Sequence, residues 1–333
     1  MQRSQPCQHV IGRTFLPYLA AALAALAVPV VAQTYPAKTV RLVVPYPPGG
    51  TADTVARAVG QKLSELWGHS LVVDNRPGAA TAIGAELVAR STPDGHTLLV
   101  AANQTLAINQ NLFRNLGYNP ARDFVLLGGL AAAKHILIVH ASVPARSLVE
   151  LISYAKANEN KLSYGSIGNA SPSHLNMELF KTMAGLSIVH VPYKGGAPAM
   201  TDIVGGHVQM MLINIWISLP HIKAGRLKVI AIASDARSPL IRGTPTFAEA
   251  GLAGFESNTW WGLVAPVGTA RPIVDKISAD VAAVVNLPEI RDQKLLGAGL
   301  EPFAPDPKQF ARIVKRDTEK FARLIRQTGA TAD

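Results

Sequence analysis

Short apolar runs rich in β-branched residues alternate along the chain with longer segments in which apolar residues recur at helical spacing. The short runs predict strands at residues 40–45, 71–74, 97–101, 136–140, 161–164, 187–192, 208–213 and 228–233. The helical spacing predicts helices at residues 51–67, 147–157, 172–183, 197–204, 272–285 and 307–326. Such alternation is typical of parallel sheets flanked by helices, so the pattern predicts an α/β fold.

Two extended stretches, residues 126–140 and 257–266, are longer than the surrounding pattern requires and bracket the middle of the chain. We interpret them as crossovers between two lobes, because about 300 residues exceed one typical domain. Lobe 1 is predicted to contain residues 33–133 and 258–333, and lobe 2 to contain residues 134–257. The alternative is two sequential domains, which the absence of a Ser/Gly/Pro-rich linker near residue 180 disfavours.

The N-terminal segment has the pattern of a secretory signal peptide. Arg3 and Arg13 precede a mostly apolar run, and Val30 and Ala32 occupy the positions expected before a processing site. A membrane anchor is the alternative, but a spanning helix needs about 20 apolar residues, and this run is interrupted by two prolines. We therefore expect cleavage after Ala32, removal of residues 1–32 and a mature protein in the periplasm.

The amino-acid composition indicates which kinds of ligand and partner the mature protein binds. Cys7 is the single cysteine of the sequence and lies in the signal segment, so the mature protein is expected to contain neither thiol nor disulfide. The 32 Lys and Arg exceed the 22 Asp and Glu by 10, and removing Arg3 and Arg13 leaves an excess of 8. These cations are spread thinly, without the clustered basic stripe of nucleic-acid-binding proteins. A weak field that favours small anions fits better, and no nucleic-acid partner is expected.

One strand ending occurs twice: Val-Pro-Tyr followed closely by Gly-Gly, at residues 44–50 and 191–196, each before a predicted helix. Paired glycines let a ligand approach the backbone closely, and the next helix start presents free N–H groups with a partial positive charge. Such a helix start binds carboxylate or phosphate without a charged side chain. The two endings supply the candidate ligand-binding residues Tyr46, Pro48, Gly49, Gly50 and Thr51, and Tyr193, Lys194, Gly195 and Ala197.

A third polar loop, at residues 165–172, follows another predicted strand. Ser171 fits the N-cap of the next helix, with Pro172 at its first position. Open α/β sheets bind ligands outside the carboxyl ends of their strands. This loop is expected to face one crevice there, together with the strand ends at residues 103–105 and at Asn214. This reasoning adds the candidates Ser166, Gly168, Asn169, Ser171, His174, Asn103, Thr105 and Asn214.

Each candidate also has an ordinary structural interpretation. A Gly-Gly pair before a helix is a common turn, a lysine beside it is usually solvated, and a helical histidine more often caps or packs than binds. Asp53 stays a candidate contact, although it is expected to stabilise its helix or to fix the loop before it. Of Trp260 and Trp261, alternation along a strand would send one into the core and the other towards the crevice or the surface.

Sequence signatures of catalysis and metal binding are absent. Residues 164–168 lack the first glycine of a nucleophile elbow, and no HExxH, CxxC or P-loop spacing occurs. His135 and His140 lie five residues apart on an apparent strand, which predicts opposite faces rather than a shared metal. We expect no catalysis, no cofactor and no metal, and an enzyme on the same fold is kept as an alternative.

Several motifs resemble, in order along the chain, the receptors of tripartite tricarboxylate transporters, also called the Bug family. They include RLVVP at residues 41–45, PGGTAD at 48–53, VDNRPGA at 73–79, PDGHTL at 93–98, VPYKG at 191–195, GTPT at 243–246 and WGLVAP at 261–266. The resemblance implies a type II periplasmic-binding-protein fold, in which two lobes, each with a mixed, mainly parallel sheet flanked by helices, close over a ligand. It also implies that backbone N–H groups, hydroxyls and waters hold a carboxylate at residues 49–51, 166–171 and 193–197.

The function implied by the resemblance is that of a receptor that captures a di-, tri- or aromatic carboxylic acid and delivers it to membrane permease subunits. We expect the receptor to be a monomer. A periplasmic sensor subunit that reports to a receptor kinase is the alternative. Family members often have an acidic residue where this chain has Asn214, so a ligand without an amino group is favoured, and the identity of the acid stays open.

Overall fold

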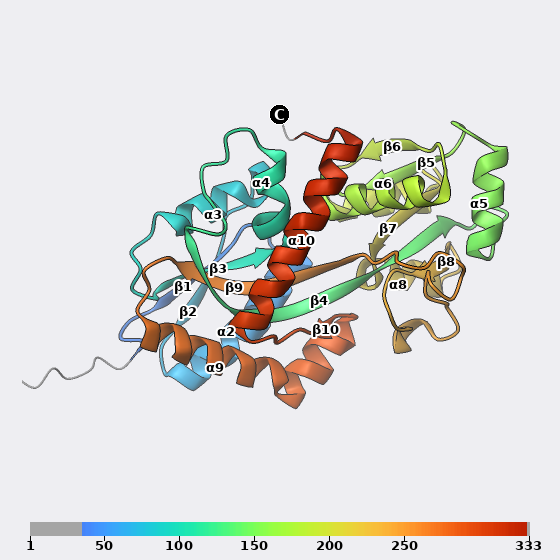
Figure 1. Cartoon of the computed structure of the whole chain (residues 1–333). Coiled ribbons are helices and arrows are strands. Elements are labelled where there is room, and N and C mark those ends of the chain that lie inside the picture. The colour runs from blue at the N-terminus through green and yellow to red at the C-terminus, as the bar shows by residue number, and fades with distance from the viewer. Residues whose placement is uncertain (1–34, 332–333) are drawn as a thin grey trace, which may run out of the picture.

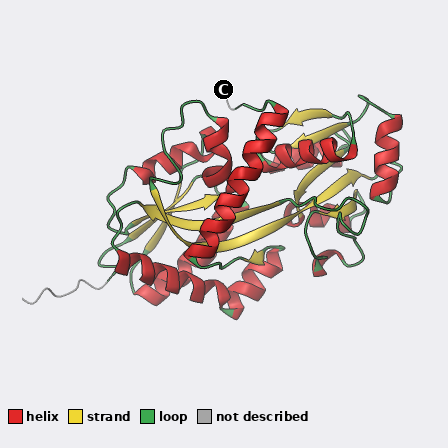
Figure 2. Ribbon diagram, viewed as in Figure 1, coloured by secondary structure: helices red, strands yellow, loops and turns green. Residues whose placement is uncertain are grey.

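The computed structural model describes residues 35–331. The signal peptide predicted at residues 1–32, with Cys7, lies outside the described residues. Two sheets lie side by side with helices on both faces, and one long strand, β4 (Phe124–His140), runs through both of them (Figures 1 and 2). Among residues 35–331, none of the helices combines the length and the apolar character needed to span a bilayer.

The first sheet has the strand order β2-β1-β3-β9-β4. β1 (Val40–Val44) pairs in parallel with β2 (Leu71–Asn75) and β3 (Thr97–Ala102). β9 (Asn258–Pro266) pairs antiparallel with both β3 and β4, and the short β10 (Glu301–Pro302) pairs with β4. A strand from late in the chain therefore lies between two strands from its first half.

The second sheet continues from β4 in the order β4-β7-β5-β6. β5 (Ser163–Ser166) pairs in parallel with β6 (Val189–Pro192) and β7 (Met210–Asn214). β7 and β8 (Leu227–Ile232) pair antiparallel with the second half of β4. Both sheets are thus mixed, as expected, but they are not mainly parallel, because every pairing that involves β4 or β9 is antiparallel.

Helices bury apolar residues against both faces of each sheet. On the first sheet, α2 (Thr51–Trp67) and α9 (Arg271–Asn286) pack on one face, and α3 (Ala82–Ala89) and α10 (Pro307–Thr328) pack on the other. On the second sheet, α5 (Leu148–Ala157) and α6 (Pro172–Ala184) share one face, opposite α7 (Gly196–Val204) and α8 (Ile215–Lys223). The short α4 (Asn109–Leu112) follows a π-helical turn at Gln104–Ile108.

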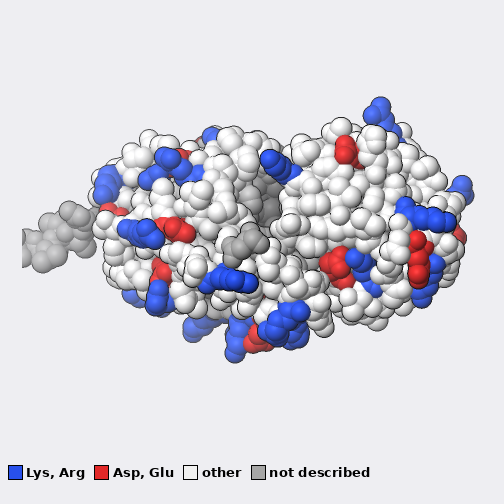
Figure 3. Space-filling model, turned by 90° about the horizontal axis from the view of Figure 1, so that it is seen from above, with Lys and Arg blue, Asp and Glu red and all other residues white. Residues whose placement is uncertain are grey.

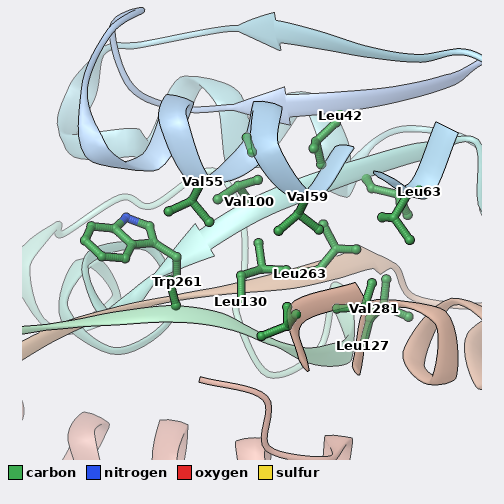
Figure 4. Packing of buried hydrophobic residues seen from close by; sticks show 14 of the residues in the cluster. Leu42, Val55, Val59, Leu63, Val100, Leu127, Leu130, Trp261, Leu263 and Val281 are labelled. Atoms are coloured by element: carbon green, nitrogen blue, oxygen red, sulfur yellow. The ribbon is translucent and has the colours of Figure 1, made fainter. Parts of the chain in front are cut away.

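The adjacent tryptophans of β9 enter opposite cores. Trp260 packs with Phe303 and Phe310 on the α10 side, whereas Trp261 packs at one end of the cluster under α2 and α9 (Figure 4). Both are almost fully buried, at 1% and 4% exposure. Neither indole therefore lies on an open surface, because helices cover both faces of the sheet, and the alternative that one of them faces the crevice stays a prediction.

The chain crosses between the sheets at two places, within β4 near His135 and just before β9 near Ser257. These positions agree with the predicted crossovers, and the assignment of residues to two lobes stays a prediction. Helix α10 complicates that assignment, because its second half packs in an apolar cluster that contains residues from both predicted lobes. In that cluster Phe321 and Leu324 meet Ile108 from the first side and Leu175 of α6.

Candidate functional site

The loop between β1 and α2 is braced by a buried carboxylate. Asp53 Oδ2 accepts hydrogen bonds from Gly49 N at 2.9 Å and Arg57 Nε at 3.0 Å, while Asn75 Nδ2 donates to Oδ1 at 2.9 Å. Burial by itself raises the pKa of Asp53, but these donors outweigh it and hold the pKa below the usual value. Asp53 therefore fixes the loop, as one of its two interpretations expected, and its charge is already balanced.

The start of α2 itself remains open. Gly50 occupies the N-cap position, and no side chain caps the helix. Gly49 has φ of +79°, a conformation that glycine adopts without strain, and a Cβ there would have no atom within 4 Å. Pro48, Gly49 and Gly50 are exposed, and Thr51 and Tyr46 are half-buried. The first-turn N–H groups thus have no side-chain cap and follow an exposed backbone segment.

Asn103 and Thr105 do not reach that space. Both side chains are 0% exposed. Asn103 Nδ2 donates to Asn258 O at 3.0 Å, its Oδ1 caps the π-helical turn, and Thr105 Oγ1 lies 2.9 Å from Thr81 Oγ1. The expectation that both face the crevice differs from the structure, because buried polar partners from distant segments take up their hydrogen-bonding groups.

The loop between β5 and α6 is held by its own serines. Ser166 Oγ and Ser171 Oγ both donate to Gly168 O, at 3.0 Å and 2.7 Å. Ser171 also caps α6 by accepting from His174 N, as predicted. His174 Nδ1 accepts from Ala170 N at 2.9 Å, so this nitrogen is committed to the loop. Asn169 is exposed at the loop surface.

The loop between β6 and α7 lies against the preceding one. Tyr193 N donates to Ser166 O at 3.0 Å, and a Cβ on Gly168 would lie 3.5 Å from Tyr193 O. The Tyr193 hydroxyl donates to Asp202 Oδ2 at 2.7 Å, and burial together with that carboxylate raises the pKa of Tyr193 to about 12. Gly195, with φ of +110°, precedes α7 without a capping side chain. Lys194 and Ala197 are exposed.

Among residues 35–331, four buried side-chain polar atoms lack a hydrogen-bond partner: Asn214 Oδ1, Trp261 Nε1, Asn176 Oδ1 and Ser278 Oγ. Asn214 ends β7 and lies opposite His135 in the β4 register. Trp261 lies beside Ala102, the last residue of β3. Figure 4 shows its indole beside Val55, with the nitrogen on the edge turned away from Leu130.

An unpaired buried polar group costs about 1–3 kcal/mol. Asn214 Oδ1 and Trp261 Nε1 lie near strand ends that lead to the candidate loops, so each is a group that a ligand could satisfy. Asn214 was among the residues predicted from the sequence. Trp261 was not, although strand alternation raised one of the two tryptophans as a crevice residue.

Side-chain hydrogen bonds tie the two crossovers together. His135 of β4 lies 2.6 Å from Ser257 Oγ through Nδ1 and 3.1 Å from Thr259 Oγ1 through Nε2. Burial, with a smaller contribution from Lys320, lowers the pKa of His135 to about 3, so the ring is neutral at pH 7. The contact between the two crossovers is therefore buried and uncharged.

The two halves of the molecule are separated by a hollow when seen from above (Figure 3). The carboxyl ends of β3 and β6 point from opposite sides toward this middle region (Figure 1). The described residues also line a cavity of about 510 Å³ beside Leu219 and Arg242 and another of about 360 Å³ beside Gln309. No candidate residue lines either of these two cavities.

Comparison with known proteins assigns the family. The sequence matches the family described as "Tripartite tricarboxylate transporter family receptor" over residues 55–330. The chain belongs to this family. It is 32% identical to protein BugT of Bordetella pertussis over 310 residues, which make up 93% of this chain and 95% of BugT.

Two solved structures of similar receptors were determined with carboxylates. An R. palustris protein with adipate is 36% identical, has a TM-score of 0.82, and is matched over 89% of this chain and 99% of its own. MatC of Rhodopseudomonas palustris with bound malate is 31% identical, with a TM-score of 0.77 and coverage of 87% and 100%. The family and the α/β periplasmic-binding-protein fold predicted from the sequence motifs are thereby confirmed.

For this tripartite transporter receptor, the predicted contact residues stay predictions. The structure places most of them in or directly beside three loops, two of which are joined by the hydrogen bond from Tyr193 N to Ser166 O. Within residues 35–331 no cluster of three or more His, Cys, Asp or Glu side chains is arranged to hold a metal ion.

Proposed function

We propose that this receptor is exported to the periplasm, captures a small carboxylate between its two lobes as a monomer, and delivers it to membrane permease subunits of a tripartite transporter. The ligand class is a di-, tri- or aromatic carboxylic acid. Support for carboxylate capture comes from two similar receptors, one solved with adipate and the other with malate. Support for delivery comes from the family to which the chain belongs.

The observation that carries the proposal is a pair of open helix starts on the two lobes. Neither α2, which follows Gly50, nor α7, which follows Gly195, has a side-chain cap. Each helix start carries a partial positive charge and free N–H donors, which is the arrangement that binds an anion. The nearest acid, Asp53, is neutralised by Arg57 and does not repel a carboxylate.

Two further groups fit a ligand held between the lobes. Trp261 Nε1 supplies a donor beside the carboxyl end of β3, and the side-chain amide of Asn214 supplies a polar group at the carboxyl end of β7. Neither carries charge, so orientation of the acid would depend on hydrogen bonds rather than on ion pairs. Closure would bring the two sets of donors to opposite ends of one ligand.

The test is calorimetric titration with adipate, malate and citrate, comparing wild type with Gly49→Val and the control Gly225→Val. Both glycines have positive φ, +79° and +70°, and a Cβ on either would meet no atom within 4 Å. The two variants therefore carry similar backbone strain, but Gly225 lies at the turn between α8 and β8, outside the candidate loops.

We expect wild type and Gly225→Val to bind at least one acid equally well. Gly49→Val should bind at least about tenfold more weakly, because its side chain blocks the approach to the α2 start. Wild type that binds none of the acids at millimolar concentration would contradict the proposal. Unchanged affinity in Gly49→Val would show that the α2 start is not an anion site.

A further inference from the structure

Three aromatic rings form a parallel stack directly beneath the loop between β5 and α6. His174 of α6 and His190 of β6 stack with ring centroids 3.9 Å apart and planes 5° apart. Tyr164 of β5 continues the stack against His190 at 4.8 Å. The two histidines, called the histidine pair below, come from different elements and meet behind the predicted ligand loop.

Each histidine holds the loop through one ring nitrogen. His174 Nδ1 accepts from Ala170 N at 2.9 Å, and His190 Nε2 lies 2.7 Å from Ser166 Oγ. Because Ser166 Oγ donates its proton to Gly168 O, the network assigns His190 Nε2 as the donor to Ser166. His174 therefore acts in its neutral form, because a proton on Nδ1 would prevent it from accepting.

The loop needs such support because its backbone is strained. Ala170 has φ of +54°, which costs a residue with a Cβ about 1–2 kcal/mol, and Gly168 has φ of +140°. The hydrogen bond from Ala170 N to His174 is made at the strained residue itself. Removing it would release the loop toward ordinary backbone conformations and turn its N–H groups away from their present directions.

Burial keeps the histidine pair neutral. It is the main cause that lowers the pKa of both rings, and with the neighbouring ring it brings that of His190 to about 4. The charged groups acting on the pair are Glu178 and Lys181 of α6, which pair with each other at 2.7 Å. Asp202 of α7, the acid nearest the adjacent loop, is engaged by the hydroxyl of Tyr193.

We propose that His174 and His190 are positioning residues, whose neutral stacked rings hold the β5–α6 loop in the shape in which it binds the ligand carboxylate. This inference rests on the proposed function. It separates His174 from a ligand contact, because a histidine that touched the carboxylate would strengthen binding when protonated, whereas His174, which holds the loop as an acceptor, would weaken binding when protonated.

The first test compares two substitutions at one position. In His174→Asn the side-chain oxygen can take the place of Nδ1 and accept from Ala170 N, whereas His174→Leu fills the space without an acceptor. We expect His174→Leu to bind adipate or malate about tenfold more weakly, a factor that corresponds to about 1.4 kcal/mol. His174→Asn should stay within about threefold of wild type. Equal losses in the two variants, or no loss in either, would overturn the inference.

His190→Gln and His190→Leu form a second comparison if His174→Leu does not fold. The amide nitrogen of glutamine can reach Ser166 Oγ in place of Nε2, and leucine cannot. Affinities are compared only after thermal melts show that each variant is folded at the titration temperature. Retained binding in His190→Gln with a loss of about tenfold in His190→Leu supports positioning, and identical behaviour contradicts it.

The closing experiment measures affinity from about pH 7.5 to about pH 4.5 for wild type and His174→Asn. Protonation of the ligand is common to both proteins, so the ratio of their affinities isolates the histidine. The affinity of wild type relative to His174→Asn should fall as the pH is lowered. A rise would assign His174 as a direct anion contact and overturn positioning. Wild type that binds no acid would instead overturn the proposed function, and the inference with it.

Discussion

The two adjacent tryptophans of β9 allow a prediction with an internal control. Trp260 and Trp261 are both nearly fully buried, but their indole nitrogens differ. Trp260 Nε1 donates to Asp317 Oδ2 at 2.7 Å, whereas Trp261 Nε1 has no hydrogen-bond partner among residues 35–331. Replacing each in turn by phenylalanine removes one N–H group and a similar volume, so the two variants should differ mainly in what that group was bonded to.

The magnitudes follow from these partners. Trp260→Phe deprives the 4%-exposed Asp317 of a donor and should lower the free energy of unfolding by about 2–4 kcal/mol, including about 1 kcal/mol of lost packing. Trp261→Phe loses similar packing but also relieves a buried unpaired donor, so its stability should stay within about 1 kcal/mol of wild type. A hydrogen bond to a carboxylate contributes about 1.5–3 kcal/mol, so Trp261→Phe should weaken ligand binding about tenfold to a hundredfold.

Urea unfolding and calorimetric titration with adipate or malate check both quantities on the same samples. Trp260→Phe is expected to be less stable with unchanged affinity, and Trp261→Phe to be nearly as stable as wild type with reduced affinity. If Trp261→Phe binds as tightly as wild type, the indole is not a ligand donor. If both variants lose the same stability, the distinction between a paired and an unpaired indole is wrong.

Three further predictions concern pH, capping and packing. Between pH 7 and pH 5, urea unfolding should show wild type losing about 2 kcal/mol more than His135→Gln, because the pKa of His135 falls from 6.5 to about 3 on folding and only the unfolded chain then takes up the proton; equal losses would contradict a neutral buried ring. Asp306→Ala should cost about 1 kcal/mol by removing the capping box of α10, whereas the exposed control Lys308→Ala should change stability by less than about 0.5 kcal/mol. Gly262→Ala should cost about 1–3 kcal/mol in the same assay, since its Cβ would lie 2.3 Å from the ring of Phe310; a stability equal to wild type would show that this core can shift.

Features that depend on local sequence were predictable here. The strand endings near Gly49 and Gly195 and the N-cap at Ser171 were found from turn and capping residues within a few positions. Extended stretches at the crossovers were recognised, and the stretch expected at residues 126–140 agrees closely with β4, which is hydrogen-bonded in both sheets. α3 and α8 were missed, since they follow their strands or turns without the apolar spacing that marked the other helices.

Features that depend on distant partners were not predictable. Asn103 was expected at the crevice but donates to Asn258 O, a residue 155 positions away along the chain. The ring stack joins His174, on a helix, to His190, on a strand, and no local sequence pattern indicates that the two rings meet. Trp261 could be raised as a candidate by alternation, but its unpaired nitrogen appears only once both helix layers are in place.

The position of β9 between β3 and β4 has a consequence for how the chain can be divided and how it folds. β3 and β4 cannot complete the first sheet until the chain has been synthesised through β9. β9 follows all the strands of the second sheet in the sequence and must then insert between β3 and β4. A fragment that ends before Asn258 would leave two exposed strand edges, which are prone to pairing with other chains. Folding must therefore await a contact between segments far apart in sequence, which slows it, and a separable first lobe would require the C-terminal segment to be reattached through a circularly permuted chain.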